Sequence, residues 1–157
     1  MSFGFVFPGQ GSQSLGMLAA LASAERRVRA TFDEASTALG YDLWRLVQEG
    51  PESDLNATER TQPAMLAAGV ATWRLWRHRG GAVPAVVSGH SLGEFTALVC
   101  AEALEFGAAI DLVRFRGQIM QAAVPAGAGF GASGFGVGSA AGAATSCAKT
   151  GRMKDSK

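Results

Sequence analysis

One stretch, residues 83–94, constrains this chain more than any other. The β-branched residues in its first half predict a short buried strand. That strand runs into the pattern Gly89-x-Ser91-x-Gly93, and the apolar residues after it predict a helix. A serine between glycines at a strand-to-helix turn is typical of a nucleophile elbow, where bulkier side chains would clash. The stretch therefore predicts an acyl-transfer nucleophile at Ser91, with the N–H of Leu92 facing the oxyanion.

Composition limits the class of protein. A chain of 157 residues is long enough for one domain with a hydrophobic core. Its net charge of +1 argues against a dedicated nucleic-acid binder. The two cysteines form neither a disulfide framework nor a zinc motif, and no apolar run approaches the roughly 20 residues that span a bilayer. We therefore expect a cytoplasmic protein with no metal, no membrane and no nucleic-acid partner.

Further strands and helices are predicted from apolar periodicity and from caps. A strand is expected at residues 3–7, followed by a glycine-containing loop at 8–13 and a helical segment from about residue 16. One helix is expected to begin after a Ser23 cap and to end at Gly40, and a short one to cover residues 42–47. A third is expected to begin at a Thr58 or Thr61 cap, with Pro63 in its first turn. A fourth is expected over residues 105–124.

The helix expected over 105–124 carries an arginine in an unusual setting. Apolar residues flank Arg116 on the helix surface, whereas Arg114 follows Asp111 by three residues and is expected to be solvated. A guanidinium on an apolar flank needs an anionic partner, because a buried charge that loses its partner costs about 3–5 kcal/mol. The partner is either a carboxylate of this chain or the carboxylate of a substrate, and the residues alone leave both open.

The character of the chain changes near residue 126. Of the 23 residues from 126 to 148, 18 are Gly, Ala or Ser, and a polar tail over 149–157 follows. No periodicity is visible there, and little could offset the cost of ordering the glycines. We therefore predict a partial domain over residues 1–128 and a disordered tail over 129–157.

Four motifs, taken in order, resemble those of the malonyl-CoA:acyl carrier protein transacylases and of the related acyltransferase domains of polyketide synthases. The resemblance covers residues 1 to about 128 and implies an α/β fold, with a mostly parallel sheet, helices on both faces and an α/β-hydrolase-like core. The motifs are Phe7–Gln13, Thr61–Ala64, Gly89–Glu94 and Arg116–Gln121.

The resemblance implies a role for each matching position. Ser91 would be the acylated nucleophile, and the backbone N–H groups of Gln10 and Leu92 would form the oxyanion hole. Arg116 would bind the free carboxylate of the malonyl group. Gln62 and Met120 would line the acyl pocket, and His90 would support the elbow.

The implied reaction belongs to fatty acid biosynthesis. A malonyl group would pass from malonyl-CoA to Ser91, and then to the phosphopantetheine thiol of acyl carrier protein. Malonyl-CoA would be a substrate, and no cofactor is expected.

The chain departs from this family in two respects. The family's general base is a histidine well downstream of the serine, whereas both histidines here, His78 and His90, precede Ser91. The side chain next to an elbow serine points away from it, so His90 is not expected to act as the base. The family's small ferredoxin-like subdomain also has no recognisable counterpart.

We therefore hypothesise an N-terminal fragment, with a tail that arose from a shifted reading frame or an error in the gene model. Loss of a general base removes a factor of about 10²–10⁴ in rate, so a defective enzyme is expected. Two alternatives stay open. One is a non-catalytic fragment that binds the carrier protein or a homologue. The other is a serine esterase, which would need an acidic residue and a histidine after the serine.

Overall fold

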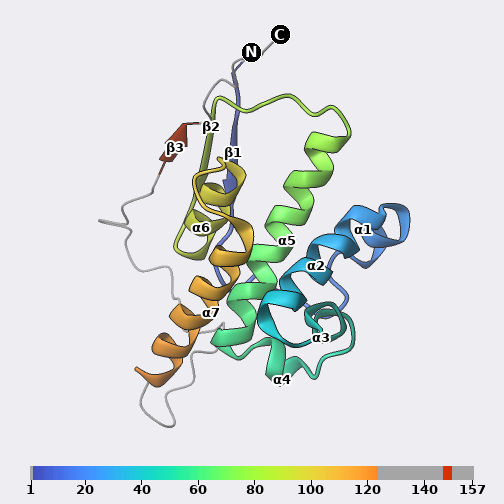
Figure 1. Cartoon of the computed structure of the whole chain (residues 1–157), viewed down its shortest axis with the longest axis vertical. Helices are drawn as coiled ribbons and strands as arrows, with labels where there is room; N and C mark the ends of the chain where they lie inside the picture. Colours follow the sequence, from blue (N-terminus) through green and yellow to red (C-terminus); the bar gives the residue numbers. More distant parts are fainter. Residues whose placement is uncertain (1, 124–146, 150–157) are drawn as a thin grey trace.

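The chain forms an α/β fold in which a small sheet lies against a group of helices (Figure 1). The computed structural model describes residues 2–123 and the backbone of 147–149. The elements are β1 (Gly4–Phe7), α1 (Ala19–Ala24), α2 (Arg26–Leu39), α3 (Leu43–Glu49), α4 (Glu52–Leu55), α5 (Thr58–His78), β2 (Val86–Gly89), α6 (Leu92–Cys100), α7 (Phe106–Ala122) and β3 (Cys147–Lys149). The expected fold class is confirmed.

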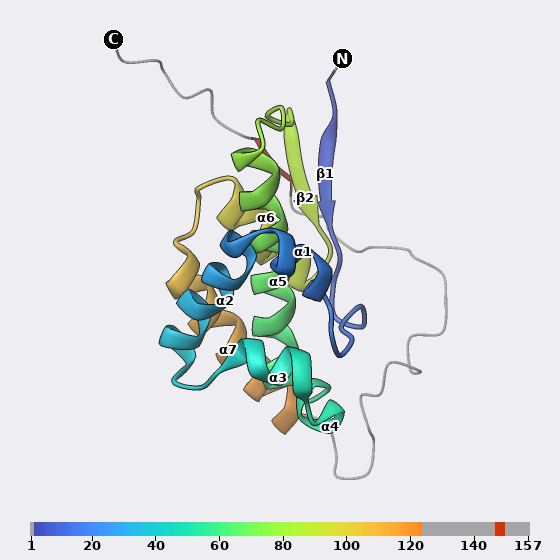
Figure 2. The ribbon, with the colours of Figure 1, turned by 90° about the vertical axis from the view of Figure 1, so that its right-hand side faces the viewer.

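Strands β1 and β2 run parallel, with Phe5 opposite Val87 and Phe7 opposite Gly89. Side chains alternate between the faces of a strand, so Phe5, Phe7 and Val87 share one face. The described helices cover that face (Figures 1 and 2), and Val87 is fully buried. On the other face, Val6 is 76% exposed. The expectation of helices on both faces is therefore not met by the described residues.

Strand β3 corrects the expectation for the tail. Its backbone pairs antiparallel with β2, with Ser88 opposite Cys147, so β2 is the central strand and one of the two pairings is not parallel. The free edge of a strand offers N–H and C=O groups to any extended backbone, whatever its side chains. No regular structure was expected over 129–157, and this is wrong at 147–149. The rest of that range lies outside the described residues.

Helix ends follow the predictions only in part. Gly40 closes α2 in the left-handed conformation, as predicted. Ser23 is not the cap, because its hydroxyl donates to the Ala19 carbonyl within α1, and α2 begins after Glu25. Thr58 is the first residue of α5 rather than its cap. Pro63 accordingly lies inside that helix, beyond its first turn.

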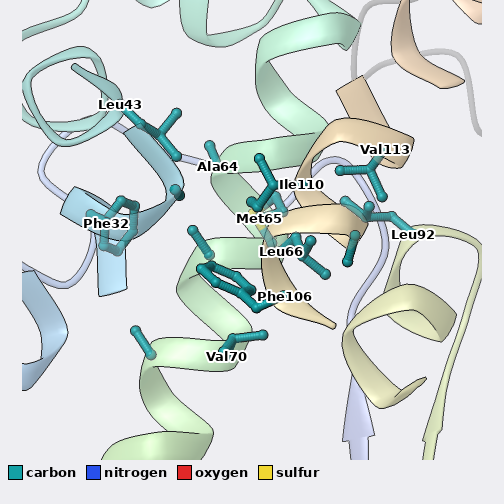
Figure 3. Packing of buried hydrophobic residues seen from close by; sticks show 14 of the residues in the cluster. Phe32, Leu43, Ala64, Met65, Leu66, Val70, Leu92, Phe106, Ile110 and Val113 are labelled. Carbon is teal, nitrogen blue, oxygen red and sulfur yellow. The ribbon is translucent and has the colours of Figure 1, made fainter. Parts of the chain in front are cut away.

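Helix α5 crosses the centre of the core and positions the helices around it (Figure 3). Leu66 of α5, Ile110 of α7 and Leu92 at the start of α6 meet there, and each is almost fully buried. Where α7 crosses the first turn of α5, Gly117 allows a close approach. A Cβ atom at that position would lie 2.6 Å from the Cα of Glu59.

The start of α7 is capped by Glu105. Its carboxylate accepts hydrogen bonds from the N–H groups of Ala108 and Gly107, and these bonds lower the pKa of the carboxyl below its usual value. A depressed pKa means that the cap contributes at neutral pH and is lost as the pH falls through the acid range. The cap fixes where α7 begins, and hence which of its residues reach the elbow.

Replacing Gly117 with alanine should destabilise the fold, because α7 would have to move away from α5. We expect a loss of about 1–3 kcal/mol in the free energy of unfolding, measured by urea denaturation. Gly107→Ala on the same helix is the matched control. Its Cβ would meet only the flexible end of the Glu105 side chain, at 3.2 Å. That variant should be neutral or more stable by up to about 1 kcal/mol. Equal effects of the two substitutions would contradict the close-approach argument.

Candidate functional site

The elbow predicted at Ser91 is present. Ser91 lies between β2 and α6 with a φ of 55°, a value that non-glycine residues seldom adopt. A Cβ atom at Gly89 would lie 2.0 Å from the carbonyl carbon of Gly93. A Cβ atom at Gly93 would lie 2.2 Å from the carbonyl oxygen of Phe7. Glycine is therefore required on both sides of the serine, and the two glycines allow the turn that projects it.

The first turn of α6 leaves one N–H group available beside the serine. The N–H groups of Gly93 and Glu94 donate to the carbonyls of His90 and Ser91, at 2.9 and 3.2 Å. Within residues 2–123, no hydrogen bond engages the N–H of Leu92, whose side chain is buried in the core. An unpaired N–H at the positive end of a helix suits a developing negative charge.

The loop after β1 packs directly against the elbow. A Cβ atom at Gly9 would lie 3.2 Å from the carbonyl oxygen of His90 and 4.0 Å from the Cβ of Ser91. The next residue, Gln10, donates from Nε2 to the hydroxyl of Thr58 at 3.4 Å. Its backbone N–H has no hydrogen-bond partner in the described part of the chain. Gln10 and Leu92 thus come from two segments that meet at Ser91.

Arg116 reaches the serine from α7. Its Nη2 donates to Ser91 Oγ at 2.9 Å, and its Nη1 donates to Gln62 Oε1 at 2.8 Å. Gln62 is fully buried, and its Nε2 donates to Met120 Sδ at 3.3 Å. These side chains, predicted from separate motifs, therefore form one connected cluster around Ser91.

Arg116 has no carboxylate partner in the described residues, where the ion pairs are formed by other arginines. One of the two partners left open by the sequence, a carboxylate of this chain, is thus not found there. Arg114 behaves as predicted, since it pairs with Asp111 at 3.2 Å on the helix surface. Among the described residues, the two arginines, two residues apart on α7, therefore differ in whether a carboxylate pairs with them.

Two neighbours of the site were missed by the sequence. The ring of Phe95 lies 5.8 Å from the Cζ of Arg116. Thr58, 3% exposed, accepts from Gln10 and donates its N–H to Gln121 Oε1 at 3.4 Å, which links the loop to α5 and α7. The spacing of Phe95 four residues after Ser91 was an available signal, because residues four apart share a helix face. Thr58 was marked only as a candidate helix cap, and nothing local indicated its contact with Gln10.

The histidines do not join the cluster. His90 is exposed, and its backbone supports the elbow by donating to Phe7 at 3.4 Å and accepting from Gly93. His78 lies in the last turn of α5. Among the described residues, no group of three or more His, Cys, Asp or Glu side chains could hold a metal ion. In that part of the chain, no helix is long and apolar enough to cross a membrane.

A hollow of about 470 Å³ lies away from this cluster, between α5 and the connection from α6 to α7. Its lining includes Trp73, Glu102 and Phe106 but none of the site residues. We place the candidate site at Ser91 rather than in this hollow, because within the described residues a nucleophile, unpaired N–H groups and a cation converge at Ser91.

A serine on a nucleophile elbow, beside N–H donors and an arginine with no carboxylate partner among the described residues, is the arrangement typical of serine-dependent acyl-transfer sites on α/β folds. The acyl transferase domain family matches residues 4–140 of this chain, past the boundary expected near residue 128. The chain belongs to this family.

Similar proteins carry more specific names. The malonyl CoA-acyl carrier protein transacylase of Salmonella typhimurium is 59% identical over 127 residues, which are 81% of this chain and 41% of that protein. The crystal structure of an acyl carrier protein S-malonyltransferase from Vibrio cholerae is 62% identical, with a TM-score of 0.79 over 81% of this chain and 42% of that chain. A malonyl-transacylase solved with a type II polyketide acyl carrier protein is 61% identical, with a TM-score of 0.78 over 80% of this chain and 40% of that chain. The chain thus spans 30–41% of the length of the curated relatives it is similar to.

The free cysteine near the end of α6 should be unreactive. Cys100 is 4% exposed, and burial raises the pKa of its thiol to about 12 from the ordinary 9.0. Alkylation of Cys100 by iodoacetamide at pH 8, followed by peptide mapping, should be at least about a hundred-fold slower in the folded chain than in urea.

The same shift predicts how stability depends on pH. The folded pKa lies above the unfolded one, so the stability that this thiol contributes is present below pH 9 and is lost as the pH rises towards 12. Equal alkylation rates in the folded and unfolded chain would show that Cys100 is accessible.

Proposed function

We propose that this chain carries the malonyl-binding half of a malonyl-CoA:acyl carrier protein transacylase site, which acts in fatty acid biosynthesis in the cytoplasm. The observation that carries the proposal is the guanidinium of Arg116, 2.9 Å from Ser91 Oγ and without a carboxylate partner in the described residues. A cation beside a nucleophile suits an acyl group that bears its own anion. The names of the relatives supply the same substrate and acceptor.

The first step would form a malonyl ester on Ser91. Its Oγ attacks the thioester carbonyl carbon of malonyl-CoA and loses its proton, and the N–H groups of Leu92 and Gln10 stabilise the oxyanion. The C–S bond then breaks, and the thiolate of coenzyme A leaves and takes up a proton. In the second step the phosphopantetheine thiol of acyl carrier protein attacks the ester carbonyl carbon; a C–S bond forms, the C–O bond to Ser91 breaks, and the proton lost by the thiol is returned to Ser91 Oγ.

The remaining site residues position the acyl group. Arg116 would pair with the free carboxylate, and Gln62 holds Arg116 through its buried amide oxygen. Met120, whose sulfur accepts a hydrogen bond from the amide nitrogen of Gln62, would contact the acyl chain. As proposed, these steps require no cofactor or metal. His90 supports the elbow through its backbone.

Catalysis by the described residues should be slow. Neither histidine is hydrogen-bonded to Ser91 Oγ, and a general base contributes about 10²–10⁴ in rate. This observation favours a second candidate function, in which the chain binds the malonyl donor or the carrier protein without turning over. A serine esterase for neutral acyl groups is disfavoured, because such a group would leave the Arg116 charge unpaired.

Intact mass measured after incubation with malonyl-CoA tests the proposal. A malonyl adduct should form on the parent chain, disappear in Ser91→Ala and fall at least about ten-fold in Arg116→Ala, since charged hydrogen bonds contribute about 1.5–3 kcal/mol. Arg114→Ala is the matched control, because Arg114 lies on the same helix but pairs with Asp111. It should behave like the parent.

The other outcomes separate the candidate functions. A parent chain that is folded and binds malonyl-CoA but gains no mass would support the binding function alone. An acetyl adduct from acetyl-CoA that forms as fast as the malonyl adduct would rule out the carboxylate role of Arg116.

A further inference from the structure

Arg116 contacts a third side chain besides Ser91 and Gln62. We propose that this residue, Phe95, is a positioning residue that holds the Arg116 guanidinium in place to receive the carboxylate of the acyl group. The inference rests on the proposed function, because it concerns the carboxylate subsite of the same site. Phe95 does not touch the reacting atoms and would act only through Arg116.

The geometry places Phe95 and the nucleophile on one side of α6. Phe95 follows Ser91 by four residues, and residues at that spacing stack one above the other along a helix. Arg116 approaches this side from α7. Its Nη2 bonds to Ser91 at 2.9 Å, and its Cζ lies 5.8 Å from the centroid of the Phe95 ring.

The ring supplies a restraint that the two hydrogen bonds lack. Ser91 and Gln62 hold Arg116 through single N–H groups on Nη2 and Nη1, which leaves the guanidinium free to tilt about the line between them. An aromatic face attracts a cation through its quadrupole. Phe95, partly buried against the core, therefore limits this tilt from a fixed position.

An aromatic ring is better suited to this task than a carboxylate. Arg74 also lies over a ring, that of Phe106 at 4.7 Å, but Glu34 pairs with it through a second contact. The charge of Arg74 is therefore neutralised. Within the described part of the chain, Arg116 is held by two neutral oxygen atoms and a ring, which leaves its positive charge available to an incoming carboxylate.

Protection of Arg116 from phenylglyoxal by free malonate tests the inference without any need for turnover. Peptide mapping would give the malonate concentration that halves the modification of Arg116 in the whole chain. Phe95→Leu, which keeps apolar bulk but removes the ring, should raise that concentration about two- to five-fold. Phe95→Tyr keeps the ring and should restore the parent value.

Two further variants control for folding. Phe115→Leu removes a ring that is 58% exposed on α7 and should leave malonate protection unchanged. Phe95→Met, with a flexible side chain of similar volume, should behave like Phe95→Leu if that variant proves unstable. Thermal unfolding of every variant identifies effects that come from lost packing.

Each outcome bears on a different claim. If the same malonate concentration halves the modification of Arg116 in Phe95→Leu and in the parent chain, the inference is overturned and the proposed function is left intact. Equal weakening in Phe95→Leu and Phe95→Tyr would also overturn it, because the role would then be packing alone. Absence of protection in the parent chain would overturn the carboxylate subsite itself, and with it both the proposed function and the inference.

Discussion

The candidate site depends on one close packing contact, between the elbow and the end of β1. Gly93 lies so near the Phe7 carbonyl that any side chain there would overlap it. This contact fixes where α6 begins and keeps Ser91 at its positive φ, a conformation that costs about 1–3 kcal/mol. The buried side chains of Leu92 and Val87 on either side of the turn hold it in place. The core therefore sustains the strain that projects the nucleophile.

A second close contact brings the cation to the nucleophile. Gly117 allows α7 to lie against the first turn of α5, and the neighbouring Arg116 then reaches both Gln62 on α5 and Ser91 at the elbow. A longer distance between the helices would separate these hydrogen bonds, since Gln62 is fully buried and cannot follow α7. Both contacts use the absence of a side chain to bring functional groups together.

Features encoded by neighbouring residues were predictable from the sequence. The elbow, the end of α2 at Gly40 and the length of α7 depend on residues within a few positions of each other. The Ser23 cap was wrong because its hydroxyl bonds backwards into α1, which has no strong periodic signal. The exposed face of Val6 and the pairing of β3 depend on how distant segments are arranged in space, which periodicity does not report.

The site shows the same division between local and distant information. Ser91 and Leu92 were predictable from one stretch, and Arg116 from its apolar flank on one helix. The bond between Arg116 and Ser91 joins residues 25 positions apart, and their meeting depends on the crossing of α5, α6 and α7. The proposed positioning role of Phe95 depends on the same crossing, because Arg116 lies over its ring only when α7 is packed in place.

The bond between Arg116 and Ser91 also affects which acyl groups the site would accept. Without substrate, the guanidinium donates to the nucleophile itself. Under the proposed function, a carboxylate offers this guanidinium a stronger, charged acceptor, so its arrival would draw the N–H away from Ser91 Oγ and free the lone pair for attack. A neutral acyl group offers no such exchange. Discrimination would therefore arise at the nucleophile as well as in the binding of the acyl group.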